Sequence, residues 1–185
     1  MENFLIEARK LAYSETEKYG IPAIPLIDLA TSVGKRIAKE LNTNIDIVEA
    51  GTLLMDCALG QALKENRGSE HVQLSLDKAN KLINESSLSS EEKENILHCI
   101  QEHHGSNKFY SLESEICCNA DCYRFISIEG FILSIKYGRE MSFEDLVILL
   151  KNKVNEKWNA LSLDISKKEL ASQYESVIEL LKNLK

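Results

Sequence analysis

The chain has 185 residues, a net charge of −7 and 44% hydrophobic residues, which suits one globular domain. A nucleic-acid binder that relies on phosphate contacts normally carries a basic patch, whereas lysine and arginine are here spread among aspartate and glutamate. No apolar run approaches the ~18 residues of a membrane span, and the N-terminal residues lack a signal-peptide pattern. We therefore expect neither a nucleic acid nor a membrane as partner.

Apolar residues recur at helical spacing along most of the chain. Leucine, glutamate, isoleucine and lysine are abundant, and only two prolines and eight glycines occur, which favours helix. The sequence predicts an all-α fold of about seven to eight helices in a single domain spanning residues 1–185. The predicted helices cover, in chain order, about residues 4–12, 26–41, 46–63, 71–83, 90–104, 112–137, 143–158 and 170–184.

The boundaries between these helices carry their own signals. The segment Gly20–Pro25 contains two prolines, which cannot continue a helix interior. Ser89 and Glu92 have the spacing of a capping box at a helix start, and Gly105 is placed to end the same helix.

The five cysteines are an odd number, and each lies in a predicted helix. This arrangement is typical of reduced thiols in a cytosol and not of a disulfide framework. We therefore expect a cytoplasmic protein with free cysteines.

Asp56 is the most informative polar residue, because its neighbours from Thr52 to Leu59 are nearly all apolar. The nearest basic residue along the chain is Lys64, and an unpaired buried carboxylate is strongly destabilising. A partner must come from elsewhere in the fold. A metal ion is one candidate, and a backbone N–H or a core serine is the other.

Asp121 also lies in an apolar helical segment, beside Ile116 and Phe125. Arg124 follows it at the i+3 position, where an ion pair on the helix surface gives the carboxylate an ordinary structural partner. The sequence therefore indicates a functional role for Asp121 less clearly than for Asp56.

All four histidines lie between these two aspartates. His103 and His104 continue an apolar stripe toward a helix end, so that one of them should face the interior. It either caps the helix C-terminus, where a cationic imidazole suits the dipole, or binds a metal. His71 is the first residue of a predicted helix, and it is a candidate ligand only because Asp56, His103 and His104 accompany it. His98 is expected to face solvent.

Four short motifs follow one another along the chain: LLMDCA at 53–58, a histidine that opens a helix at 71, IQEHHG at 100–105 and the Ala-Asp pair at 120–121. In order and spacing they resemble the HD superfamily of metal-dependent phosphohydrolases, from about residue 19 to residue 135. The resemblance implies an HD-like helical domain with a core at about 19–137 and C-terminal helices at about 142–185. It also implies divalent metal ions that assist hydrolysis of a phosphoric ester or anhydride.

The sequence departs from the family at two metal ligands. Leu26 aligns with the first histidine of the family, and Met55 replaces the histidine of the His-Asp pair. Neither side chain can ligate a hard or borderline divalent ion. The resemblance then leaves one damaged, one-metal site, with ligands from Asp56, His71 and one of His103 and His104.

Two functions remain open. In the first, the chain is a phosphohydrolase that binds one Mn, Zn, Fe or Mg ion through these ligands and acts on a nucleotide or another small phosphoester. Asp56 and Asp121 are then the catalytic residues, and Asp121 orients the attacking water or acts as general base. In the second, the chain is an inactive HD-fold protein that binds a small ligand or a protein partner, with no metal.

A third reading is a helical interaction domain without a ligand. In that case Trp158 and the last predicted helix form a face for a dimer.

Overall fold

The computed structural model describes residues 1–138 and 140–184, and its regular structure is entirely helical over these residues. The all-α prediction is therefore confirmed. Arg139 and Lys185, which belong to the predicted domain, lie outside the described residues. The helices are α1 (Glu2–Tyr19), α2 (Ile24–Glu40), α3 (Ile45–Leu54), α4 (Leu59–Lys64), the 3-10 helix η1 (Gly68–Glu70), α5 (His71–Asn84), α6 (Ser90–Gln101), α7 (Leu112–Ile126), α8 (Ile128–Tyr137), α9 (Phe143–Ala160) and α10 (Asp164–Asn183).

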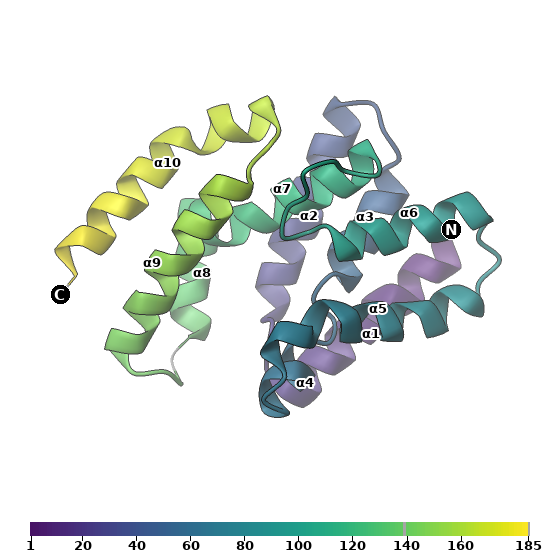
Figure 1. Cartoon of the computed structure of the whole chain (residues 1–185), viewed down its shortest axis with the longest axis horizontal. Coiled ribbons are helices and arrows are strands. Elements are labelled where there is room, and N and C mark those ends of the chain that lie inside the picture. Colours follow the sequence, from purple (N-terminus) through teal and green to yellow (C-terminus); the bar gives the residue numbers. More distant parts are fainter. Residues whose placement is uncertain (139, 185) are drawn as a thin grey trace.

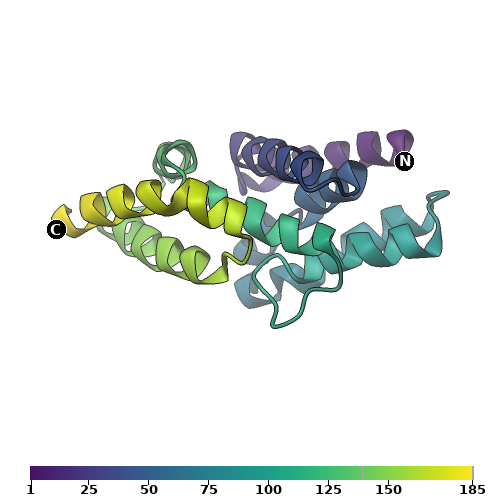
Figure 2. The ribbon, with the colours of Figure 1, turned by 90° about the horizontal axis from the view of Figure 1, so that it is seen from above.

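Helix α7 runs across the middle of the molecule and joins its two ends (Figure 1). It packs against α2, α3 and α6 toward the N-terminal end and against α8, α9 and α10 toward the C-terminal end. The two termini lie at opposite ends of the elongated molecule (Figures 1 and 2). Among the described residues, no helix has both the length and the apolar content of a membrane span.

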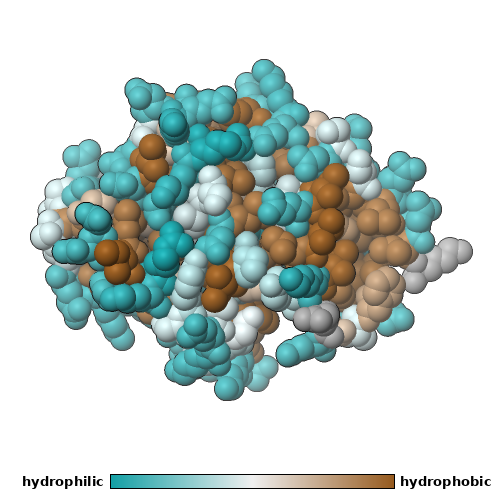
Figure 3. All heavy atoms as spheres, turned by 180° about the vertical axis from the view of Figure 1, so that it is seen from behind, coloured by the Kyte–Doolittle hydropathy of each residue, from teal (hydrophilic) through white to brown (hydrophobic). Residues whose placement is uncertain are grey.

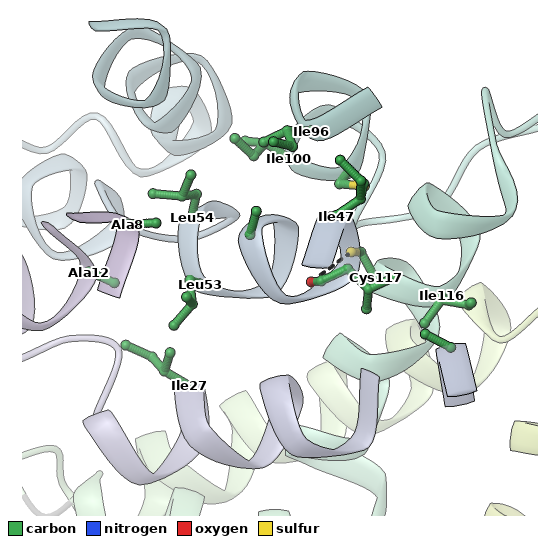
Figure 4. Close-up of a cluster of buried hydrophobic side chains, with 14 of the residues drawn as sticks. Ala8, Ala12, Ile27, Ile47, Leu53, Leu54, Ile96, Ile100, Ile116 and Cys117 are labelled. Carbon is green, nitrogen blue, oxygen red and sulfur yellow. Dashed lines mark hydrogen bonds between the residues drawn. The ribbon is translucent and has the colours of Figure 1, made fainter. Parts of the chain in front are cut away.

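The main apolar core lies around α3, whose residues from Ile47 to Leu54 are all buried. Figure 4 shows side chains of α1, α2, α6 and α7 pointing toward this helix. The stripes that predicted these helices therefore face one interior, and Leu53 and Leu54, just ahead of Asp56 in the chain, are part of it. Core residues labelled in Figure 4 include Ala8, Ala12, Ile27, Leu53, Leu54, Ile96, Ile100 and Cys117.

A second, smaller apolar cluster holds α8, α9 and α10 together. Trp158 of α9 stacks on Tyr174 of α10, with ring centroids 4.2 Å apart and planes 9° from parallel. Trp158 thus packs within its own chain and is partly exposed, and the dimer face stays a prediction. The buried members of the cluster are Phe131, Leu146, Val147, Leu150, Val154, Val177 and Leu181.

Two of the predicted helices are each divided in two, so the described residues form ten α-helices where the sequence predicts about seven or eight. Residues 46–63 are interrupted by a turn at 55–58, and residues 112–137 are interrupted at Ser127. Ser127 is extended, with φ −65° and ψ 147°, and its side chain accepts a hydrogen bond from the Gly130 N–H. A Cβ on Gly130 would lie 2.2 Å from the Tyr123 carbonyl oxygen, so the tight junction requires glycine.

All five cysteines are buried and free, as the sequence predicts. Burial raises the pKa of the Cys57 thiol to about 12 and also raises the pKa of Cys99 and Cys122. The sulfur of Cys117 lies 3.7 Å from the Val48 carbonyl oxygen (Figure 4), so it takes part in the contact between α7 and α3.

Gly51→Ala is expected to destabilise the fold by at least ~1–3 kcal/mol, the usual cost of overpacking a core. A Cβ at Gly51 would lie 2.5 Å from the Cys99 Cβ, and Cys99 belongs to the adjacent helix α6. Gly68→Ala is the matched control, because its Cβ would meet only the flexible end of Leu63, at 3.2 Å. Urea unfolding of both variants measures the difference, and equal stabilities would contradict the close packing of α3 on α6.

Candidate metal centre

Asp56 is buried in the turn between α3 and α4. The side chain of Ser75, from α5, accepts a hydrogen bond of 3.1 Å from the Ala58 N–H of the same turn. Ser75 is completely buried and follows His71 by one helical turn. This contact fastens the start of α5 to the turn and brings His71 beside Asp56.

His71 and His103 both point their Nε2 atoms at the same oxygen of Asp56. Nε2 lies 3.5 Å from Asp56 Oδ1 for His71 and 3.4 Å for His103. Each ring also places its Nδ1 against a backbone carbonyl, 2.8 Å from Gly68 O and 2.7 Å from Ile100 O respectively. A carbonyl only accepts, so in the neutral rings Nδ1 carries the proton and Nε2 has a free lone pair.

His103 therefore agrees with both interpretations of the sequence, a helix cap and a metal ligand. Its Nδ1–H donates to the Ile100 carbonyl near the C-terminal end of α6, as a helix cap does. Its Nε2 faces Asp56 and the other imidazoles, as a metal ligand does. Both histidines of the 103–104 pair lie at the site, although the sequence left open which one would.

Three ligand atoms converge with the spacing of a coordination shell. Bonds of ~2.0–2.2 Å from a divalent ion to nitrogen and oxygen put neighbouring ligand atoms roughly 3–3.5 Å apart. Asp56 Oδ1 and His103 Nε2 are buried and have no hydrogen-bond partner among the described residues. With neutral rings, acceptors face acceptors here, and a cation between them removes the conflict. Asp56, His71 and His103 thus fit a divalent metal ion.

His104 completes the cluster but is oriented differently. Its Nε2 lies 2.9 Å from His71 Nε2, and its Nδ1 lies 2.7 Å from the ammonium nitrogen of Lys157. One ligand atom from each of Asp56, His71, His103 and His104 lies within 4.8 Å of the others. Burial, the His103 ring and the Lys157 ammonium lower the pKa of His104 to about 3, so this ring is neutral near pH 7.

Arg124 joins the two aspartates. Its guanidinium donates to Asp56 Oδ2 at 2.6 Å, and its Nε forms an ion pair with Asp121 Oδ1 at 3.0 Å. The predicted pairing with Asp121 is confirmed, but its predicted place on the helix surface is wrong, because Arg124 is only 5% exposed. Most residues of α7 around Arg124 are buried, so the arginine side chain lies inside the protein, beside Asp56.

Lys157 of α9 forms a second buried ion pair, 2.6 Å from Asp121 Oδ2. Burial acts to raise the pKa of both carboxyls, but the nearby cations outweigh it. Arg124 and Lys157 lower the pKa of Asp121 to about 2, and Arg124 with His103 holds that of Asp56 well below its usual range. Both aspartates are therefore ionised near neutral pH.

His98 makes its contacts outside this cluster. His98 is partly exposed, stacks on Tyr110 with ring centroids 4.1 Å apart, and lies 3.1 Å from a carboxylate oxygen of Glu102. Leu26 is partly buried, and Met55 is fully buried. Asp28 faces α1, where it accepts a hydrogen bond from the Tyr13 hydroxyl.

The sequence did not single out Lys157, although it carries a signal for it. Leu150, Val154 and Lys157 follow one another at helical spacing, so the lysine continues the apolar stripe of α9 into the interior. A cation at an apolar position needs an acidic partner, and Asp121 meets that need.

A groove of about 520 Å³ opens beside the exposed edge of His104. It is lined by the 105–109 loop and by the last turns of α9, including Glu156 and Asn159. The side chain of His104 is 34% exposed and that of His71 15%, whereas His103 is completely buried. Access to the cluster is therefore from the side of His104.

No family model and no curated protein matches the sequence. Among solved structures, the fold is similar to that of YpgQ from Bacillus subtilis, at 16% identity and a TM-score of 0.67, over 98% of this chain and 94% of that one. The structure of YpgQ in complex with ADP matches at 16% identity and a TM-score of 0.64, over 96% and 95% of the two chains. At this identity the similarity shows a shared fold.

Arg124→Met is expected to destabilise the protein by ~3–5 kcal/mol, because it leaves Asp56 and Asp121 short of a buried positive partner. Arg36→Met is the control, since its pair with Glu169 is 44% and 39% exposed and should contribute at most ~1 kcal/mol. Urea unfolding without added metal measures both. A loss no larger in the first variant than in the second would show that Arg124 does not hold the site together.

Proposed function

We propose that the chain is a divergent HD-type, metal-dependent phosphohydrolase with a one-metal site, acting on a nucleotide or another small phosphoester. The observation that carries the proposal is the convergence of Asp56 Oδ1, His71 Nε2 and His103 Nε2, with both rings oriented by backbone carbonyls. Two imidazoles and one carboxylate form a ligand set suited to Zn, Mn or Fe, with positions left for water and substrate.

The similarity in fold to YpgQ supports a nucleotide as the substrate class, because YpgQ has been crystallised in complex with ADP. The support comes from the fold alone, and the choice of substrate must be argued from the site. The groove borders His104, the most exposed member of the cluster, and we expect a small phosphorylated molecule to approach from that side.

A divalent ion bound there would polarise a phosphate oxygen and lower the pKa of its water. The protein's own residues divide the remaining work. Asp56 and His71 supply ligand atoms, and His104 borders the groove with a ring that is neutral near pH 7. Asp121, with a pKa of about 2, is a weak base, and both its oxygens face cations. We therefore assign Asp121 the positioning of Arg124 and Lys157.

A second candidate function is the binding of a small ligand without catalysis. It is favoured by the charges of the cluster, where Asp56 and Asp121 face Arg124 and Lys157. The two carboxylates are thus neutralised before any metal binds, so the cluster can be stable as a set of internal ion pairs. Metal content and turnover separate the two functions.

Protein purified without chelator is expected to hold about one divalent ion per chain, because one ligand set is complete. His71→Ala should abolish binding, since it removes one of three ligands from a position that is partly exposed. His98→Ala is the matched control and should bind as the wild type does. Elemental analysis and calorimetry with Mn²⁺ and Zn²⁺ provide the measurement. A wild type that binds neither ion, before or after addition, would falsify the proposed metal site.

Turnover is tested on the metal-loaded protein with a panel of nucleoside phosphates and simple phosphoesters. Release of phosphate or pyrophosphate that disappears in His71→Ala supports hydrolysis. Metal binding with no turnover, together with a rise in melting temperature on addition of ADP, would support the second candidate function instead.

A further inference from the structure

The ammonium group of Lys157 lies close to three hydrogen-bond acceptors. Its Nζ lies 2.6 Å from Asp121 Oδ2, 2.7 Å from His104 Nδ1 and 3.3 Å from Glu156 Oε1. An ammonium group has three hydrogens and no lone pair, so it can only donate. The side chain is 1% exposed, and these three contacts therefore determine its position.

The Lys157 ammonium determines which nitrogen of His104 carries the proton, and this in turn determines the hydrogen bond between His104 and His71. Because Lys157 donates to Nδ1 of His104, the proton of that neutral ring must be on Nε2. This Nε2–H points at Nε2 of His71, 2.9 Å away, which has a free lone pair because its Nδ1–H donates to Gly68. His104 therefore enters the cluster as a hydrogen-bond donor, while His71 and His103 enter it as acceptors.

We propose that Lys157 opposes metal binding at this site, by holding His104 in a form that cannot ligate and by placing a fixed positive charge beside the ligands. The proposal rests on the one-metal site proposed above and adds a positioning residue to it. With Lys157 in place the ligands are Asp56, His71 and His103, and a divalent ion must displace the His104 N–H from the single lone pair of His71 Nε2 before it binds. Without Lys157 the free Nδ1 can take the proton, so that His104 Nε2 becomes a fourth ligand.

Lys157→Met removes the charge and the donor while keeping a side chain of similar length. It is expected to bind Mn²⁺ or Zn²⁺ on the order of tenfold more tightly, the size of effect that residues behind metal ligands usually have. Lys157→Arg retains a cation that donates, and its affinity should stay near that of the wild type. Calorimetry with each ion alone measures the affinities, and X-ray absorption counts the imidazoles, two in the wild type and three in Lys157→Met.

Two double variants separate the causes and guard against unfolding. Asp121→Asn with Lys157→Met removes both members of the ion pair, so the summed charge is that of the wild type, and Arg124 keeps Asp56 as its partner. It should keep the third imidazole with a smaller gain in affinity. His104→Ala with Lys157→Met cannot gain that ligand and should show only the gain from the lost charge.

The outcomes distinguish this proposal from the proposed function. A wild type that binds metal, with a Lys157→Met variant that binds it no more tightly and still through two imidazoles, overturns the role of Lys157 alone. A wild type that binds no metal, with a Lys157→Met variant that does, supports the role of Lys157 and overturns the metal enzyme. If neither binds, both proposals fail.

A separate observation concerns the outer face of α8. Ile128, Ile132 and Ile135 lie on one face of this helix and are 49%, 58% and 38% exposed. Figure 3 shows apolar side chains gathered over this part of the back surface. Exposed apolar residues continue beyond the helix end at Tyr137, Met141 and Phe143.

The charges on α8 suit a second copy of the same chain. Glu129 and Lys136 are equally far along the helix from the point between Ile132 and Leu133. A two-fold axis through that point would therefore bring Glu129 of one copy opposite Lys136 of the other. Glu129 lies in the first turn of α8 and Lys136 in its last turn, and both are exposed. When two copies pair antiparallel about that axis, each Glu129 faces the other copy's Lys136, and Ile132 lies at the centre. The six exposed apolar residues offer on the order of 600 Å² per chain, close to the ~800 Å² of a standard interface.

The geometry points to an antiparallel homodimer through α8. Ile132→Glu should convert it to a monomer in sedimentation equilibrium, whereas Leu63→Glu, at an exposed position on α4, should leave it unchanged. Glu129→Lys should weaken the dimer by placing like charges together, and Glu129→Lys with Lys136→Glu should restore it. A monomeric wild type overturns the proposal, and so does an Ile132→Glu variant that dimerises as the wild type does.

Discussion

The site depends on one guanidinium. Arg124 bridges Asp56 of the α3–α4 turn and Asp121 of α7, and it is the strongest favourable charge beside either carboxylate. Burial opposes ionisation of both aspartates, so two negative groups persist in this interior because Arg124 lies between them and Lys157 pairs with Asp121. The bridge also explains why the turn at 55–58 and the middle of α7 come together, since each contributes one half of the same ion pair.

The sequence predicts the helical fold well because the physical cause of that fold is local. Apolar stripes such as Ala8 with Ala12, or Ile96 with Ile100, mark the buried face of each helix wherever its partner lies. The divisions at 55–58 and at Ser127 were missed because apolar residues continue across both. At the second, the signal was present in Ser127 and Gly130, a serine cap followed by a glycine that the tight junction requires.

The candidate site was predictable in part. The isolation of Asp56 among apolar residues indicated a distant partner, and the four motifs brought His71, His103 and His104 to it. The identity of that partner was not predictable, because Arg124 is 68 residues away in sequence and already has Asp121 at the i+3 position. Local spacing offered a sufficient explanation for Arg124, and only the packing of α7 against the turn shows that it serves both aspartates.

The burial of the cysteines determines when their thiols can be oxidised. Only a thiolate reacts readily with oxidants, and the surroundings of Cys57, Cys99 and Cys122 keep those sulfurs protonated and out of contact with solvent. Oxidation of these sulfurs must therefore wait for the core to open. Chemical damage to these thiols is then a result of unfolding and not its cause, and a chain that stays folded keeps them reduced.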